Sequence, residues 1–168
     1  MDSMIESLYV NKGLYSALFV PVCAKYKLTM TEMLVLLFLS QDTQYDTASD
    51  IVDKLKITKS HVSASMRDLE ERGYLQGSYA GRNHRTIHLH LCGGADEIVR
   101  EGKSVQQKFL SVISRGFTDE ELRTLGSYIK RISENVEDYL QNRLFDERSQ
   151  DPCKNKKAVP SSQSFRMN

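Results

Sequence analysis

Histidine and cysteine side chains near residue 90 have the chemistry that zinc prefers. They alternate along one predicted strand and therefore share a face: His84, His88, His90 and Cys92. Imidazole nitrogen and thiolate sulfur are common zinc ligands. Neighbours on one face of a strand lie about 7 Å apart, however, so one strand closes a tetrahedral site only awkwardly. The outer, solvated face of a hairpin explains the pattern more simply, and we expect no metal and no cofactor.

The sequence contains three cysteines, Cys23, Cys92 and Cys153, with no CxxC pair. An odd number without pairing disfavours a disulfide scaffold and favours a reducing, cytoplasmic location. Cys23 falls near the end of a predicted helix, among aromatic residues, which favours a buried structural thiol. A redox-sensing thiol is the alternative.

Motifs of common enzyme chemistry are missing from the sequence. There is no glycine-rich phosphate loop, no pair of catalytic carboxylates and no GxSxG, and Gly93-Gly94 lacks the rest of a nucleotide fingerprint. We therefore expect no enzymatic activity. No apolar run approaches the ~20 residues that span a bilayer, and the first residues do not resemble a secretory signal. We expect no membrane partner.

The length of 168 residues, with 40% hydrophobic and 27% charged residues, is typical of one globular domain with an accessory element. Residues 146–168 are polar and lack an apolar period, which predicts a disordered tail. Residues 5–26 have helical periodicity, with Gly13 and Pro21 as weak points.

Two further helices are predicted after residue 95, and the second begins at a Thr118–Glu121 capping box. Their apolar residues step by three and four: Ile98, Gly102, Val105, Phe109 and Val112, then Leu122, Leu125, Ile129, Ile132, Val136 and Tyr139. A seam this narrow resembles a coiled-coil surface and favours a dimerisation element. An antiparallel helix hairpin within a monomer is the alternative.

Between these zones, residues 28–91 contain short, sharply bounded elements. Capping boxes at Thr29 and Thr47 begin helices over 30–40 and 48–55, and Thr58 begins a third helix that ends at Gly73. Two short helices joined by a tight turn form a helix-turn-helix. A predicted hairpin follows, in which Ile87, Leu89 and Leu91 share one face. The expected fold is mainly α with a small β-hairpin wing, a winged helix-turn-helix.

The third of these helices has a polar face suited to the major groove of DNA. Val62, Met66 and Leu69 should be buried, while the opposite side carries small, polar or basic residues. With the residues that begin the helix, the candidate DNA contacts are Thr58, Lys59, Ser60, His61, Ser63, Ala64 and Arg67. An ordinary amphipathic helix with a solvated face is the alternative.

Positive charge is concentrated around this helix, although the whole chain carries only +1. Residues 54–85 hold seven basic and three acidic residues, whereas residues 96–138 hold seven basic and nine acidic ones. Arg82 and Arg85 fall at the predicted hairpin tip, where arginine can enter an adjacent minor groove. A charged tip that is merely solvated is the alternative.

The segment TASDIVDKLKITKSHVSASMRDLEERGYL, followed by RNHRTIHLHL, resembles the MarR family of bacterial winged-helix repressors. The LTMTEMLVLLFL segment and the two C-terminal helices extend the resemblance over residues 8–140. The resemblance implies a homodimer with interlocked N- and C-terminal helices and two lobes that bind a pseudo-palindromic operator in double-stranded DNA. It implies a transcription regulator, most simply a repressor; a thiol-based redox sensor and a winged-helix protein-interaction module are the alternatives.

By position, the resemblance assigns DNA recognition to Ser60, His61, Ser63, Ala64 and Arg67, and the wing arginine to Arg85. The family's wing aspartate is replaced by Asn83. The resemblance implies a site for small aromatic or anionic effectors between the dimer helices and the lobe, which Tyr15, Phe19, Met33 and Phe38 could line. Ordinary core packing of these four residues is the alternative. The implied division is a dimerisation helix at 1–27, the DNA-binding domain at 28–92, dimerisation helices at 93–145 and the tail at 146–168.

Overall fold

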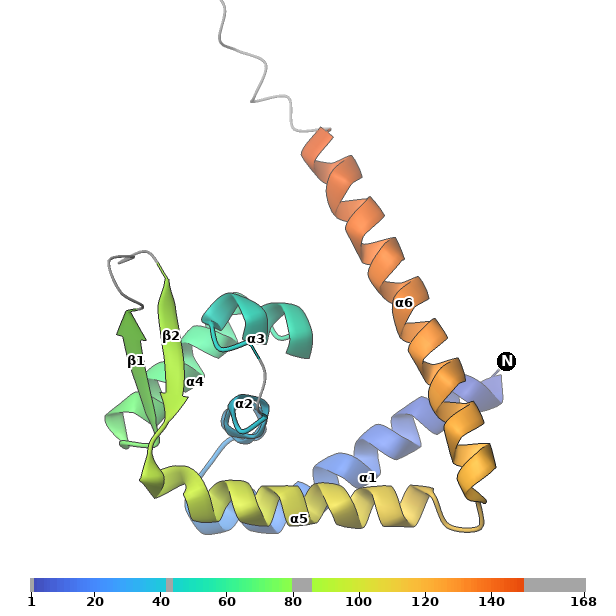
Figure 1. The fold of residues 1–168 in the computed structure, drawn as a ribbon, viewed down its shortest axis with the longest axis horizontal. Helices are drawn as coiled ribbons and strands as arrows, with labels where there is room; N and C mark the ends of the chain where they lie inside the picture. Colours follow the sequence, from blue (N-terminus) through green and yellow to red (C-terminus); the bar gives the residue numbers. More distant parts are fainter. Residues whose placement is uncertain (1, 42–43, 80–85, 150–168) are drawn as a thin grey trace, which may run out of the picture. The chain divides into compact units, whose positions relative to one another are not determined.

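The computed structural model describes residues 2–41, 44–79 and 86–149, with side chains described between residues 3 and 140 of these ranges. The chain divides into two compact units, Met1–Arg115 and Gly116–Asn168. The first unit contains five α-helices and a two-stranded sheet, and the second contains one long helix within the described ranges (Figure 1). Mainly helical structure with one small hairpin confirms the predicted fold class.

Helix α1 (Asp2–Tyr26) is continuous through both predicted weak points, Gly13 and Pro21. A proline inside a helix removes one backbone hydrogen bond without necessarily breaking the helix. The helix ends where Lys27 adopts a left-handed conformation, with φ of 52°. The amide of Leu28 then donates to the carbonyl of Cys23 at 2.8 Å, which closes the last turn.

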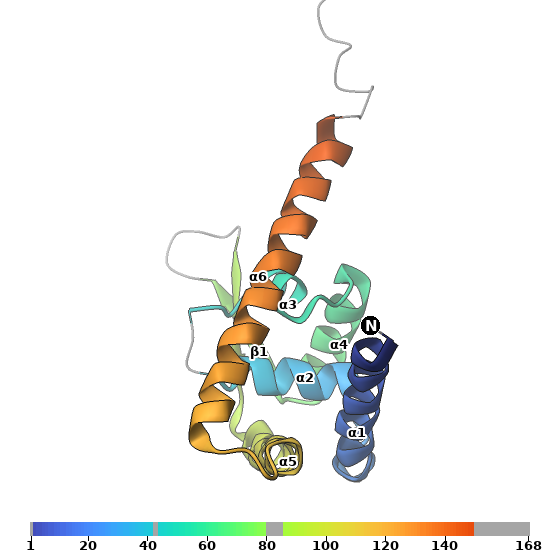
Figure 2. The same ribbon diagram turned by 90° about the vertical axis from the view of Figure 1, so that its right-hand side faces the viewer.

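Helix α2 (Met30–Leu39) lies at the centre of the first unit, between α1, α4 and α5 (Figure 2). Its predicted capping box is present, because Thr29 and Glu32 exchange backbone and side-chain hydrogen bonds. The helix is almost entirely apolar, and Met33, Val35 and Leu36 have no exposed surface. A helix that is apolar around most of its circumference must be covered on several sides.

Helices α3 (Ala48–Leu55) and α4 (Lys59–Glu71) form the helix-turn-helix. The capping box of Thr47 and Asp50 begins α3, as predicted. The turn between the helices depends on Lys56, which has a left-handed φ of 54°. Helix α4 is followed by Gly73 with φ of 70°, a conformation that favours glycine. The predicted end of this helix is therefore confirmed.

The hairpin pairs β1 (Leu75–Tyr79) with β2 (Ile87–Leu91) in antiparallel register, with Leu75 opposite Leu91. The expected apolar face is only partly buried, because Leu89 is 3% exposed but Ile87 is 45% exposed. The opposite face, expected to be the outer, solvated one, is only partly exposed at His88. That side chain is half-buried and contacts Asp46, in the segment that precedes α3.

Helix α5 (Asp96–Ile113) follows the short 3-10 turn η1 (Gly93–Ala95) and packs on α1 and α2. Ile98, Val99 and Gly102 are buried, so the first half of α5 belongs to the core of its own unit. Further along, Val112 and Ile113 are exposed. The apolar seam of this helix is thus divided between the internal core and the surface.

In the second unit, α6 (Asp119–Ser149) begins at the predicted capping box of Thr118 and Glu121. The carboxylate of Glu121 accepts hydrogen bonds from the Thr118 amide and hydroxyl, which lower the pKa of this side chain. The helix continues beyond residue 145, into the start of the predicted tail; residues 150–168 lie outside the described ranges. Among the described residues, no helix is long and apolar enough to cross a membrane.

Candidate nucleic-acid interface

Burial on α4 fixes which side of this helix faces outward. Val62 and Leu69 have no exposed surface, Ser65 is buried beside them, and Met66 is half-buried. These side chains pack against α2, α3 and β1. The predicted buried face is correct, with Ser65 as an additional member.

The side of α4 opposite this buried stripe carries the predicted recognition residues. Ser60, His61, Ser63 and Arg67 are exposed, and Ala64 is half-buried. The Arg67 guanidinium lies 3.9 Å from the Asp68 carboxylate, with both side chains more than half exposed, so this contact holds the arginine only weakly. The exposed face therefore carries small side chains, an imidazole and a weakly held guanidinium. A helix face of this kind can enter the major groove of DNA.

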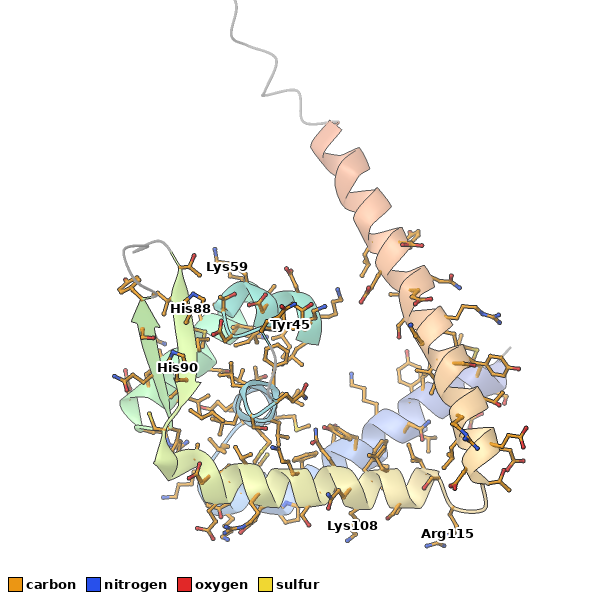
Figure 3. The ribbon with its side chains drawn as sticks, viewed as in Figure 1. Tyr45, Lys59, His88, His90, Lys108 and Arg115 are labelled. Atoms are coloured by element: carbon orange, nitrogen blue, oxygen red, sulfur yellow. The ribbon has the colours of Figure 1, made fainter. Side chains whose placement is uncertain are left out.

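The first turn of α4 has unused backbone donors. Thr58 occupies the N-cap position but makes no side-chain capping hydrogen bond, and its hydroxyl lies 3.2 Å from that of Ser60. Lys59 is exposed at the start of the helix and points outward (Figure 3). Exposed amides at a helix N-terminus, beside a lysine and two hydroxyls, suit a phosphate group.

Two of the basic residues that sequence analysis counted here have internal contacts. The Lys54 ammonium lies 4.5 Å from the ring centre of Tyr45. Arg72 donates to two backbone carbonyls at the end of α1, those of Tyr26 and Lys27. Net charge alone could not distinguish these cations from ones that are free to reach a phosphate.

The wing is fixed at its base by a contact that sequence analysis missed. The Leu89 amide donates to the Asp46 carbonyl at 2.8 Å, and His88 Nδ1 lies 2.8 Å from Asp46 Oδ1. This contact ties the hairpin to the segment before α3. The predicted wing residues Arg82, Asn83 and Arg85 lie outside the described residues.

The two histidines among the potential zinc ligands that the structure describes have other partners. His88 pairs with Asp46, and His90 Nε2 lies 2.9 Å from the hydroxyl of Ser78 on the neighbouring strand. Within the described ranges, no group of three or more His, Cys, Asp or Glu side chains could hold a metal ion. His84 lies outside those ranges.

Cys23 is half-buried against the hydrophobic core. Burial, together with the negative charge of Glu32, raises the pKa of its thiol. A raised pKa reduces the thiolate fraction, which is the reactive form. The environment of Cys23 is therefore closer to that of a structural thiol than to that of an oxidant sensor.

The residues assigned to an effector site lie in or beside the core. Phe19 and Met33 have no exposed surface, and Phe38 is also buried. Tyr15 is half-buried, with its ring centre 4.9 Å from that of Phe19. A groove of about 570 Å³ lies nearby, where the ends of α2 and β2 meet α5, and it is lined by Ser40, Leu91, Asp96, Val99, Arg100, Lys103, Ser104 and Gln107.

Three helices, the last two forming a helix-turn-helix, are followed by a two-stranded hairpin, and this arrangement defines a winged-helix fold. Residues 26–82 match the sequence model of the MarR family. This match covers α2 to β1, and this part of the chain is similar to the MarR family.

The chain is also similar to individual proteins. The transcriptional regulator ZitR of Lactococcus lactis subsp. cremoris is 26% identical over 111 residues, which are 64% of this chain and 75% of ZitR. A MarR-family regulator from Listeria monocytogenes, solved with a 26-mer DNA, shares the fold with a TM-score of 0.73 at 19% identity, over 83% of this chain and 93% of that one. A MarR/EmrR-family regulator from Acinetobacter sp. ADP1 has a TM-score of 0.69 at 19% identity, over 82% and 96% of the two chains.

Proposed function

We propose that this regulator represses transcription by binding a pseudo-palindromic operator as a homodimer, with α4 of each subunit in the major groove. The observation that carries this proposal is the outward face of α4, where Ser60, His61 and Arg67 are exposed while Val62 and Leu69 hold the helix to the core. Two such helices would enter successive major grooves ~34–36 Å apart and occlude a promoter. The DNA complex of the Listeria relative supports this mode of binding.

Exposed apolar side chains support the homodimer. In the first unit, Met4, Ile5 and Leu8 of α1 are each more than half exposed. In the second unit, Ile129, Ile132 and Val136 of α6 are each at least 46% exposed and share one face of the helix. Apolar stripes of this kind mark protein–protein interfaces, and a second copy of this chain is the partner that the family's architecture supplies.

An anionic or aromatic small molecule would release the DNA by favouring a different separation of the two lobes. Tyr15, Phe19, Met33 and Phe38 would have to open for such a ligand, because most of them are buried. The groove beside α5 needs no such opening. Arg100 and Lys103 line it together with Asp96 and the apolar Leu91 and Val99, and Lys103 also donates to the Ser40 carbonyl at 3.2 Å. Two cations against one carboxylate beside apolar side chains suit a small carboxylate.

The test is a fluorescence anisotropy titration with duplex DNA from the region upstream of the protein's own coding sequence. We expect specific binding that weakens steeply between about 50 and about 200 mM salt, because phosphate contacts release counterions. Binding that ignores salt, or no binding to any duplex, would instead favour a protein-interaction module and contradict the proposal.

The dimer is tested separately by analytical ultracentrifugation at micromolar concentration. We expect a dimer for the unchanged protein and a monomer for Ile132→Asp, which places a charge in the apolar stripe of α6. Ser127→Asp, at an exposed position on the opposite side of the same helix, is the matched control and should remain dimeric. A monomeric unchanged protein would exclude operator binding as a preformed dimer.

A further inference from the structure

Arg72 is one of the seven basic residues near the recognition helix, yet its side chain is used inside the protein. It occupies the C-cap position of α4, where the chain leaves the helix toward the wing. One guanidinium nitrogen donates to the Lys27 carbonyl at 2.9 Å and another to the Tyr26 carbonyl at 2.5 Å. The two guanidinium nitrogens thus donate hydrogen bonds to the carbonyls of two consecutive residues at the end of α1.

The position of these carbonyls explains why an arginine is effective there. The last carbonyls of a helix have no amide in the following turn, and they carry the negative end of the helix dipole. A planar, always charged guanidinium can satisfy two of them at once, which a lysine ammonium does less well. Arg72 is therefore a cap for α1 that is supplied by α4.

The same guanidinium also contacts the start of the wing. Its central carbon lies 4.9 Å from the ring centre of Tyr74, the residue before β1. The Tyr74 carbonyl in turn accepts a hydrogen bond from the Cys92 amide at 3.0 Å, at the far end of β2. One side chain therefore links α1, the recognition helix and the base of the wing.

The end of α1 is also fixed to α5. The Glu101 carboxylate lies 2.5 Å from the Lys25 ammonium and 3.0 Å from the Tyr26 hydroxyl. Both partners are within two residues of the carbonyls that Arg72 holds. A continuous chain of contacts thus runs from Glu101 on α5, through the end of α1, to Arg72 on α4.

We propose that Arg72 is a positioning residue for DNA binding: it fixes the recognition helix and the wing relative to α1 and α5, and contacts no phosphate. This inference rests on the proposed function, because α1 and α5 would transmit the geometry of the dimer. Arg72 would then set the separation and inclination of the two recognition helices, and with them the half-site spacing that the dimer accepts.

The test uses the full-length protein and the tightest duplex that it selects from a random-sequence library. The same duplex is also made with one base pair inserted at, or deleted from, its centre. Arg72→Ala should bind the selected duplex about tenfold more weakly, the effect expected from losing charge-assisted hydrogen bonds. It should also discriminate less against altered spacing, while the salt dependence of binding stays unchanged. Lys59→Ala is the control, with a salt slope reduced by about one and spacing discrimination retained.

A salt slope that falls by about one in Arg72→Ala would assign this residue to phosphate binding and overturn the inference. Unchanged spacing discrimination would overturn it as well. If Arg72→Ala does not fold, Arg72→Lys takes its place in the same measurements. This variant keeps the positive charge but cannot donate to both carbonyls with the geometry of a guanidinium. Failure of the unchanged protein to select a two-fold symmetric duplex would contradict the proposed function itself. If the unchanged protein selects a two-fold symmetric duplex but the Arg72 variants keep the wild-type discrimination against altered spacing, only this inference is contradicted.

Discussion

Asp46 and His88 join the segment before α3 to the second strand of the wing. Their side chains meet at 2.8 Å, Oδ1 to Nδ1, and the Asp46 carbonyl accepts the amide of the adjacent Leu89 at the same distance. Both side chains are about one-third exposed. The hairpin is therefore held to the helix-turn-helix by backbone and side chain together, and its base is part of the lobe.

Replacement of Asp46 by alanine should loosen this attachment. The side-chain contact is partly solvated, so the free energy of unfolding should fall by only about 0.2–1 kcal/mol. DNA affinity should fall as well, because the wing would be less well oriented. Urea denaturation and anisotropy titrations measure the two effects. Ser78→Ala, which removes the Ser78–His90 contact on the same hairpin, is the control and should leave DNA affinity unchanged; an equal loss in both variants would contradict a special role for Asp46.

Residues on the outward face of α4 should control which sequence is bound. Ser60→Ala and His61→Ala should change the preferred bases, since contacts with base edges carry the sequence information. Selection from a random duplex library before and after each substitution measures this preference. Lys59→Ala serves as the comparison, with weaker binding to all sequences alike. Uniform weakening in all three variants would show that α4 is not the recognition helix.

The wing arginine should contribute affinity without fixing α4. Arg85→Ala should weaken binding and reduce the slope of log affinity against log salt by about one, the value expected for one lost phosphate contact. Anisotropy titrations at several salt concentrations give the slope. A slope that does not change would remove this part of the wing from the interface.

The carboxylate of Glu101 should make stability depend on pH in the acid range. Its contacts with Lys25 and Tyr26 hold its pKa below the ordinary value of 4.5. Because this pKa is lower in the folded state than in the unfolded one, its stabilisation is complete above about pH 5 and is lost as the pH falls through the lowered pKa. Thermal unfolding across this range should show the advantage over Glu101→Gln shrinking toward zero in acid; a constant difference would contradict the assignment.

Two glycines in helices should respond in opposite directions to alanine. A Cβ at Gly102 would lie 2.9 Å from a Leu37 methyl carbon and 3.1 Å from the Met33 sulfur, so Gly102→Ala should destabilise the protein by about 1–3 kcal/mol. A Cβ at Gly126 would have no atom within 4 Å outside its own helix backbone and chain neighbours. Gly126→Ala should therefore stabilise α6 by up to about 1 kcal/mol. Urea denaturation measures both changes, and a neutral Gly102→Ala would show that α5 can move away from α2.

The starts of α2, α3 and α6, their capping boxes and the outward face of α4 were predictable from sequence. Thr29 exchanges capping hydrogen bonds with Glu32, and Thr47 does so with Asp50, within one helical turn. The determinants of these contacts are therefore close together in the chain. The face of α4 follows from helical periodicity in the same way. These are local relationships, and residue type with spacing is enough to specify them.

The tertiary structure alone decided which polar side chains serve the interior and which remain for a ligand. Arg72 and Lys27 are 45 residues apart, and Asp46 and His88 are 42 apart. Nothing in the sequence near Arg72 distinguishes it from Arg67, although the first caps α1 and the second is exposed. A pattern of residue types specifies a periodicity, whereas a contact between distant segments depends on how the elements pack, and that packing is a property of the whole core.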